Sequence, residues 1–194
     1  MQDYRNKLKD NGYVLIKNFL SPEIVQICKS FLDLSISSGL RQPESNPYLT
    51  GNVELISPNI FADSILLAYK NTIEDLFDTE MIPSYIFFRQ YHTGSELKIH
   101  RDRPECEFSV TLLIDKDGKE SSSLVFCDDE EGNNPVEVFM EEGDAIIFSG
   151  SYGFDGKWHY RPKVEQKSIT QAFLHYVSPS NNPENLFPKP IHRD

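Results

Sequence analysis

The stretch YIFFRQYHTGSELKIHRD, residues 85–102, decides the fold of this chain. Its first half is rich in aromatic side chains, which is typical of a β-strand. A turn signal at Gly94 ends that strand, and a second segment then leads to His100 and Asp102. The stretch therefore indicates β-structure that brings a histidine and an aspartate to one place.

Short runs with β-type composition recur downstream of this stretch. They cover residues 107–115, 122–127, 136–140, 144–149 and 168–177. Many short strands with frequent turn signals between them are typical of a sandwich or jelly roll. We therefore expect a β-core over about residues 83–177, followed by an extended tail over residues 178–194.

The first part of the chain, residues 1–82, is expected to be a mainly helical support that opens with a short strand at 12–18. Ser21 and Pro22 signal a helix start, and apolar residues at helical spacing continue to about Leu34. Residues 60–77 carry a second amphipathic pattern. Residues 35–59 are polar and turn-rich, which predicts a long surface loop and a candidate lid. The whole chain is then one α+β domain, residues 1–194, in which N-terminal helices brace the β-core.

Composition excludes several classes of partner. The chain has 194 residues and a formal net charge of −11, so it lacks the basic excess expected of a duplex-binding protein, and we expect no nucleic-acid partner. No apolar run approaches the roughly 20 residues needed to cross a bilayer, so no membrane partner is expected either. The three cysteines form no CxxC pair and no secretory signal is present. These features predict a cytoplasmic protein with reduced thiols.

His100 and Asp102 have the spacing of a metal site. On a strand, residues i and i+2 point to the same face about 6.6 Å apart, so the imidazole and the carboxylate can hold one divalent ion. His159 follows the apolar segment 145–148 and supplies a second imidazole. Two histidines and one carboxylate on a β-scaffold form the facial triad of non-haem Fe(II) oxygenases. Such a triplet also arises by chance, so a structural β-sandwich without a metal is the alternative.

Three motifs extend this pattern over most of the chain. They are Arg89-x-Tyr91-x-x-Gly94-x-x-Leu97-x-x-His100-x-Asp102, then Gly143-Asp144-Ala145, and His159-Tyr160-Arg161-Pro162 with Phe173-Leu174-His175-Tyr176-Val177. With these motifs the sequence resembles the 2-oxoglutarate/Fe(II)-dependent dioxygenases of the prolyl-4-hydroxylase-like group. The resemblance implies a double-stranded β-helix, Fe(II) bound by His100, Asp102 and His159, 2-oxoglutarate as co-substrate, O2, and ascorbate as a candidate reductant.

The sequence departs from that group at the co-substrate anchor. Many members carry an arginine or lysine about ten residues after the distal histidine, where this chain has Ile169. A buried carboxylate still requires a cation. We expect Arg161 to supply it, because it shares a strand face with His159, and Lys167 is the second candidate. Tyr91 and Gln171 are expected to face the same pocket and to bind the co-substrate.

The resemblance implies hydroxylation of an unactivated C–H bond with release of succinate and CO2. Halogenating relatives carry a small residue at the position of Asp102, whereas this chain keeps the carboxylate. The substrate is expected to be a small molecule, an amino acid or a peptidyl residue, and residues 150–158 are glycine-rich enough to form a flap over it. The alternative function is a cupin-like metal-binding protein, or another non-haem metalloenzyme, that does not use 2-oxoglutarate. The sequence does not specify an oligomeric state.

Overall fold

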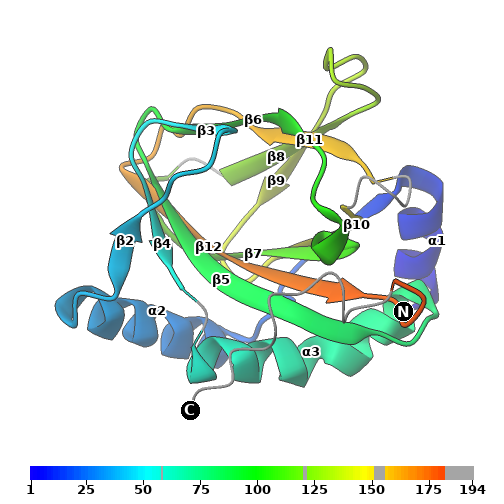
Figure 1. Ribbon diagram of the computed structural model, residues 1–194, viewed down its shortest axis with the longest axis horizontal. Coiled ribbons are helices and arrows are strands. Elements are labelled where there is room, and N and C mark those ends of the chain that lie inside the picture. Colours follow the sequence, from blue (N-terminus) through cyan, green and yellow to red (C-terminus); the bar gives the residue numbers. More distant parts are fainter. Residues whose placement is uncertain (58, 120–121, 151–155, 182–194) are drawn as a thin grey trace.

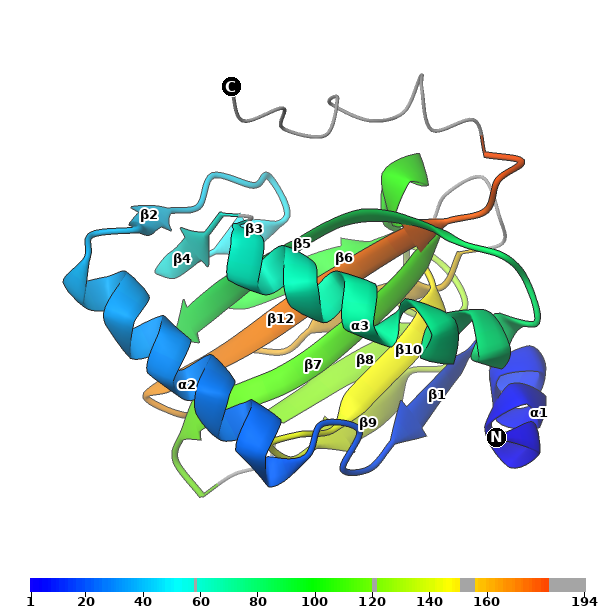
Figure 2. The same cartoon turned by 90° about the horizontal axis from the view of Figure 1, so that it is seen from below.

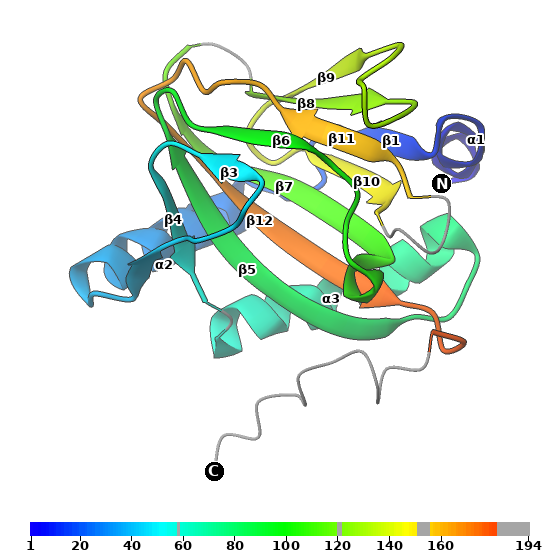
Figure 3. The same ribbon diagram turned by 45° about the horizontal axis from the view of Figure 1, so that its top comes forward.

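The computed structural model describes residues 1–57, 59–119, 122–150 and 156–181, and two antiparallel β-sheets dominate it (Figures 1 and 3). The larger sheet has the strand order β1-β10-β7-β12-β5-β4-β2, and the smaller has the order β3-β6-β11-β8-β9. The strands of the larger sheet are β1 (Tyr13–Ile16), β10 (Ala145–Ser149), β7 (Phe108–Asp117), β12 (Ser168–Val177), β5 (Ile82–His92), β4 (Val53–Ile56) and β2 (Arg41–Pro43). Those of the smaller sheet are β3 (Leu49–Thr50), β6 (Glu96–His100), β11 (Trp158–Arg161), β8 (Ser122–Cys127) and β9 (Val136–Met140). The expected jelly roll is therefore confirmed.

Helices cover the outer face of the larger sheet, as Figure 2 shows for α2 (Pro22–Ser37) and α3 (Ile60–Phe77). The helix α2 begins at the cap that the sequence indicates, where Ser21 Oγ accepts from Ile24 N at 3.4 Å, and in α3 Asn59 Oδ1 caps the helix by accepting from Ala62 N at 3.1 Å. The helix at 60–77 is confirmed, and α2 runs three residues beyond its expected end at Leu34. Within the described residues, none of the helices combines the length and the apolar character that a membrane span requires.

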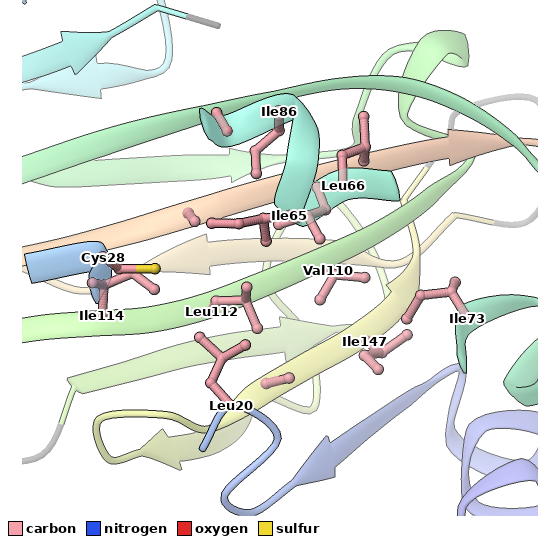
Figure 4. Close-up of a cluster of buried hydrophobic side chains, with 14 of the residues drawn as sticks. Leu20, Cys28, Ile65, Leu66, Ile73, Ile86, Val110, Leu112, Ile114 and Ile147 are labelled. Carbon is pink, nitrogen blue, oxygen red and sulfur yellow. The ribbon is translucent and has the colours of Figure 1, made fainter. Parts of the chain in front are cut away.

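The core lies in two layers because the central strands are buried on both faces. Val110, Leu112 and Ile114 of β7 point toward the helices and pack with Ile65, Leu66 and Ile147, among others (Figure 4). The intervening Leu113 points the other way, into a second cluster between the two sheets that includes Ile146, Phe148 and Ile169. This double burial explains why these strands have nearly continuous apolar sequences. The inner layer is incomplete at one end, and the functional pocket described below opens there.

One expectation for the N-terminal part was wrong, and one helix was not predicted. Residues 35–59 do not form one long loop, because β2, β3 and β4 lie within them and pair with β4, β6 and β5, respectively. These strands are short edge strands without clear apolar alternation, so their sequence carries little β-signal, and long-range pairing defines them. The helix α1 (Gln2–Asn11) was not predicted, because Leu8 is its only buried residue. Of the expected tail, residues 182–194 lie outside the described residues.

The Gly143-Asp144 motif has a structural role at the junction of β1 and β10. The buried Asp144 carboxylate accepts from Asn18 N at 3.0 Å, Glu141 N at 2.7 Å and Lys17 Nζ at 2.7 Å. Gly143 adopts φ +86°, and a Cβ there would lie 3.1 Å from Leu20 O. The motif thus closes a tight turn and ties the first strand of the chain to the core.

Replacing Asp144 with alanine is expected to lower the free energy of unfolding by about 2 kcal/mol, because two backbone N–H groups lose a charged acceptor. Chemical denaturation of the metal-free protein measures this change. Lys17→Met, which removes only the half-exposed partner of the same carboxylate, serves as the control and should cost less than about 1 kcal/mol. Equal effects of the two substitutions would show that the hydrogen bonds from the backbone to Asp144 do not contribute to the free energy of unfolding.

Candidate metal centre

His100, Asp102 and His159 come together at the open end of the pocket between the sheets. His100 ends β6 and lies directly opposite His159 of β11 in the antiparallel register. Nε2 of His100 is 3.5 Å from Asp102 Oδ1, and Nε2 of His159 is 3.7 Å from the same oxygen. One ligand atom from each of the three residues lies within 4.8 Å of the other two. The structure thus brings together the three residues that the sequence indicated as metal ligands.

Backbone carbonyl groups orient both imidazoles. Nδ1 of His100 is 2.9 Å from Lys98 O, and Nδ1 of His159 is 2.9 Å from Lys157 O. A carbonyl oxygen can only accept, so each Nδ1 donates this hydrogen bond. Nε2 is then the ring nitrogen available to a metal, and a hydrogen bond of this kind from the far ring nitrogen is the usual arrangement of metal-binding histidines.

Contacts behind Asp102 hold its carboxylate in place. Ser109 Oγ donates to Asp102 Oδ2 at 2.8 Å, and Asp102 N donates to Gly150 O at 2.8 Å. A Cβ atom at Gly150 would collide with the Asp102 carboxylate. Position 150 therefore requires a glycine, because the backbone of the 150 segment passes directly behind the acid.

The charge states suit a divalent cation. Burial lowers the pKa of His159 to about 4, so its imidazole is neutral at neutral pH. Burial alone would raise the pKa of Asp102, but the neighbouring imidazoles, first of all His159, lower it below its usual range. A carboxylate and two imidazoles on one side of a pocket are the donor set of the facial triad, which fits Fe(II) and leaves coordination positions for other ligands.

Ser109→Ala is expected to weaken metal binding by roughly 10- to 100-fold, the usual effect of losing a group that orients a ligand. Competition of Mn(II) or Zn(II) against a chelating dye measures the affinity. Ser123→Ala is the control. Ser123 lies on β8, and its Oγ donates a hydrogen bond to the exposed Glu137 Oε1 of β9 at 2.7 Å, away from the metal centre. Identical affinities for the two variants would show that Ser109 does not position Asp102.

His175 also lies beside the metal centre, although the sequence reasoning left it out of the ligand set. Its Nδ1 is 3.1 Å from Ser109 Oγ, and His175, Cys106 and Asp102 form a second group of closely spaced donor atoms. Burial raises the pKa of Cys106 and lowers that of His175 to about 4, so both are neutral. Strand alternation from Gln171 through Phe173 was the signal that placed His175 on the inward face.

The pocket has a volume of about 520 Å³ and reaches from the metal centre to Arg161. Arg161 is buried, with Nη1 donating to Ser122 Oγ at 2.8 Å and Nη2 to Gln171 Oε1 at 2.6 Å. Its guanidinium lies 5.1 Å from the centre of the Tyr91 ring. Among the described residues no carboxylate pairs with it. Arg161, Tyr91 and Gln171 are thus brought together around a buried cation that lacks an anionic partner.

Lys167 does not reach this pocket. Its side chain is 83% exposed and pairs with Asp117 at 3.1 Å. Ile169, at the position where the sequence comparison led us to look for a cation, is buried in the apolar layer between the sheets. Of the expected flap at 150–158, residues 151–155 lie outside the described residues.

Comparison with known proteins identifies the fold. No protein-family model and no curated protein matches the chain. Among solved structures, it is similar to an oxidoreductase of the 2OG-Fe(II) oxygenase family from Burkholderia pseudomallei, with a TM-score of 0.68, 16% identity, and coverage of 91% of this chain and 90% of that one. A prolyl-4-hydroxylase from Pseudomonas putida gives a TM-score of 0.65 at 14% identity, covering 90% and 97% of the two chains.

A third similar structure carries ligands. HygX from Streptomyces hygroscopicus, solved with nickel, 2-oxoglutarate and hygromycin B, gives a TM-score of 0.67 at 11% identity, covering 92% of this chain and 87% of that chain. At these identities the likeness establishes a shared fold. The chain therefore has the double-stranded β-helix that the 2-oxoglutarate oxygenases use.

Proposed function

We propose that the protein is an Fe(II)- and 2-oxoglutarate-dependent dioxygenase that hydroxylates an unactivated C–H bond and releases succinate and CO2. One observation carries the proposal: a His–Asp–His donor set shares its pocket with a buried arginine that has no acidic partner among the described residues. A metal alone does not require that arginine. A metal-binding diacid requires the metal centre and the arginine together, because one end of the diacid chelates the metal and the carboxylate at the other end needs a cation.

The spacing of His159 and Arg161 suits this ligand. Both side chains of β11 are buried and face the pocket, two residues apart and therefore roughly 6.6 Å apart along the strand. In the proposal His100, Asp102 and His159 hold Fe(II), and the Arg161 guanidinium binds the far carboxylate of 2-oxoglutarate. Tyr91 and Gln171 stand beside that carboxylate, where a hydroxyl and an amide can complete its hydrogen bonds.

When bound, Fe(II) and 2-oxoglutarate supply an oxidative decarboxylation that uses O2 and is coupled to C–H hydroxylation. The protein's own residues position and shield that chemistry. Leu97, Leu124 and Phe148 line the pocket and limit the access of water, and the Tyr48 ring stacks on His100 with 5.1 Å between centroids. The substrate is a small molecule, an amino acid or a peptidyl residue. Similar folds serve both kinds, since HygX is solved with hygromycin B and a Trichoplax adhaerens prolyl hydroxylase with a peptide fragment. We place the reaction in the cytoplasm, with ascorbate as a candidate reductant.

Anaerobic reconstitution tests the proposal. Addition of 2-oxoglutarate to the Fe(II)-loaded protein should produce a visible metal-to-ligand charge-transfer band, and admission of O2 should then yield succinate. A protein that binds Fe(II) but gives neither the band nor succinate would instead be a cupin-like metal-binding protein. A protein that binds no divalent metal would be a structural β-sandwich.

A further inference from the structure

A second buried arginine lies in the same pocket, and an acidic residue of the chain occupies it. Arg89 of β5 donates from Nε to Glu44 Oε2 and from Nη2 to Glu44 Oε1, both at 2.5 Å. The remaining Nη1 donates to the Tyr91 hydroxyl at 3.0 Å. The two side chains of the ion pair are 7% and 11% exposed. Arg89 is thus a formed carboxylate receptor that makes a side-on, two-point contact.

The wall next to this receptor is aromatic. Phe87 of β5 lies opposite Phe173 of β12, with 5.0 Å between ring centroids and an interplanar angle of 18°. The Arg89 guanidinium carbon is 5.0 Å from the Phe87 ring centre and 5.1 Å from that of Phe173. Both rings line the pocket. A ligand held at Arg89 would therefore lie with an apolar body against these rings.

Glu44 reaches the receptor from a segment at the edge of the fold. We call residues 41–50 the strap, because they connect β2 at the edge of the larger sheet to β3 at the edge of the smaller sheet (Figure 1). None of the strap residues is fully buried. Glu44 N donates to Val53 O at 3.0 Å, so the Glu44 side chain can rotate away while its backbone stays paired. Residues 44–48 also line the pocket, so that rotation would open space at its rim.

More arginines than carboxylates line the pocket within the part of the chain that the structure describes. The arginines are Arg89, Arg101, Arg103 and Arg161, and the carboxylates are those of Glu44 and Asp102. Fe(II) and the 2-oxoglutarate dianion have opposite and equal charges, so binding both leaves this excess unchanged. The excess lies within a chain of net charge −11, so it is a local property of the pocket and favours an anionic ligand.

We propose that the prime substrate carries a carboxylate that displaces Glu44 from Arg89 and lays its apolar body against Phe87 and Phe173. This inference rests on the proposed function and specifies the substrate class. Exchange of one carboxylate for another keeps Arg89 paired throughout, whereas a neutral ligand would either leave Glu44 in place or leave a buried cation alone. Glu44 therefore acts as an internal competitor that neutral molecules do not displace.

Calorimetric titration of the protein loaded anaerobically with Zn(II) and 2-oxoglutarate tests this. The probes are phenylacetate and, as the neutral molecule of the same shape, 2-phenylacetamide. Glu44→Gln should tighten phenylacetate binding at least about tenfold, because Arg89 loses its charged competitor. The control is Glu54→Gln, which removes the carboxylate that contacts the strap's Arg41 at 2.9 Å and His92 at 2.7 Å but leaves Arg89 and Glu44 intact, and it should bind like the wild type.

The double variant Glu44→Gln/Arg89→Gln removes the pair without leaving a lone buried charge, and it should bind phenylacetate no better than 2-phenylacetamide. Equal tightening in Glu44→Gln and Glu54→Gln would overturn the proposal, since a loosened strap would then explain the gain. A tenfold loss of 2-oxoglutarate affinity in the double variant, with no gain of phenylacetate binding in Glu44→Gln, would assign Arg89 to the co-substrate and also overturn it. If 2-oxoglutarate itself gives no heat of binding, the proposed function fails, and the same comparison of variants without 2-oxoglutarate still decides whether Arg89 receives carboxylates.

Discussion

Arg161→Met should weaken 2-oxoglutarate binding by about 30- to 1,000-fold, which corresponds to about 2–4 kcal/mol. The far carboxylate would lose its cation in a buried site, where Ser122, Gln171 and Tyr91 offer only neutral groups. Titration of the charge-transfer band of the Fe(II) protein gives the dissociation constant. At saturating 2-oxoglutarate the rate of succinate formation should change much less, because Arg161 binds the end of the molecule that does not react.

Lys167→Met is the matched control for Arg161→Met. Lys167 is exposed and paired with Asp117, so its loss should leave the dissociation constant unchanged. The metal-free Arg161→Met protein should also unfold at no lower denaturant concentration than the wild type, because it no longer buries a cation without an anion. An unaltered 2-oxoglutarate affinity in Arg161→Met would refute the anchor assignment. A large loss of stability would instead indicate a structural arginine.

Asp102→Ala should abolish stoichiometric Fe(II) binding and, with it, succinate formation. The substitution removes the single anionic ligand and leaves only two imidazoles, so the loss of metal affinity should exceed the roughly 100-fold upper range for groups that only orient a ligand. Equilibrium dialysis with Fe(II) under anaerobic conditions measures it directly. In thermal unfolding, added Mn(II) should raise the midpoint of the wild type but not that of Asp102→Ala.

Asp117→Ala provides the comparison for Asp102→Ala. Asp117 ends β7, and its side chain is 57% exposed, so its removal changes the total charge equally without touching the metal centre. Metal binding by Asp117→Ala should match the wild type. If Asp102→Ala retained wild-type Fe(II) affinity, the donor set would have to lie elsewhere, and the group of Cys106 and His175 would be the next to test.

Sequence patterns predicted best where a segment's own composition matched its environment. The boundaries of α3, β8, β9 and β12 agree with the expected ranges, because each has strong apolar periodicity and clear turn or cap residues at its ends. The strands β2, β3 and β4 and the helix α1 were missed for the opposite reason. The three strands are short and lack clear apolar alternation, and α1 is poorly buried, so contacts with the rest of the fold determine their structure.

In the site, too, residues with a local sequence signal were predicted and residues without one were missed. His100 and Asp102 are neighbours on the chain, and a recognisable motif joined them to His159. The pair of Glu44 and Arg89 has no such signal, because 45 residues separate its members and either one alone resembles a surface charge. Only the pairing of β4 with β5, which places the strap over the pocket, brings them together.

The register of His100 against His159 has a consequence for how the molecule opens. These two ligands sit on adjacent strands of the smaller sheet, and Asp102 is bonded to Gly150 at the end of the larger sheet's β10. A bound ion would therefore cross-link β6 to β11 and fasten both sheets at one corner, whereas the helices and their core contain none of its ligands. Metal loading should slow hydrogen–deuterium exchange at the amides of β6 and β11 far more than at those of α3. The metal-free protein would then undergo local opening confined to that corner while the helix-covered face stays protected.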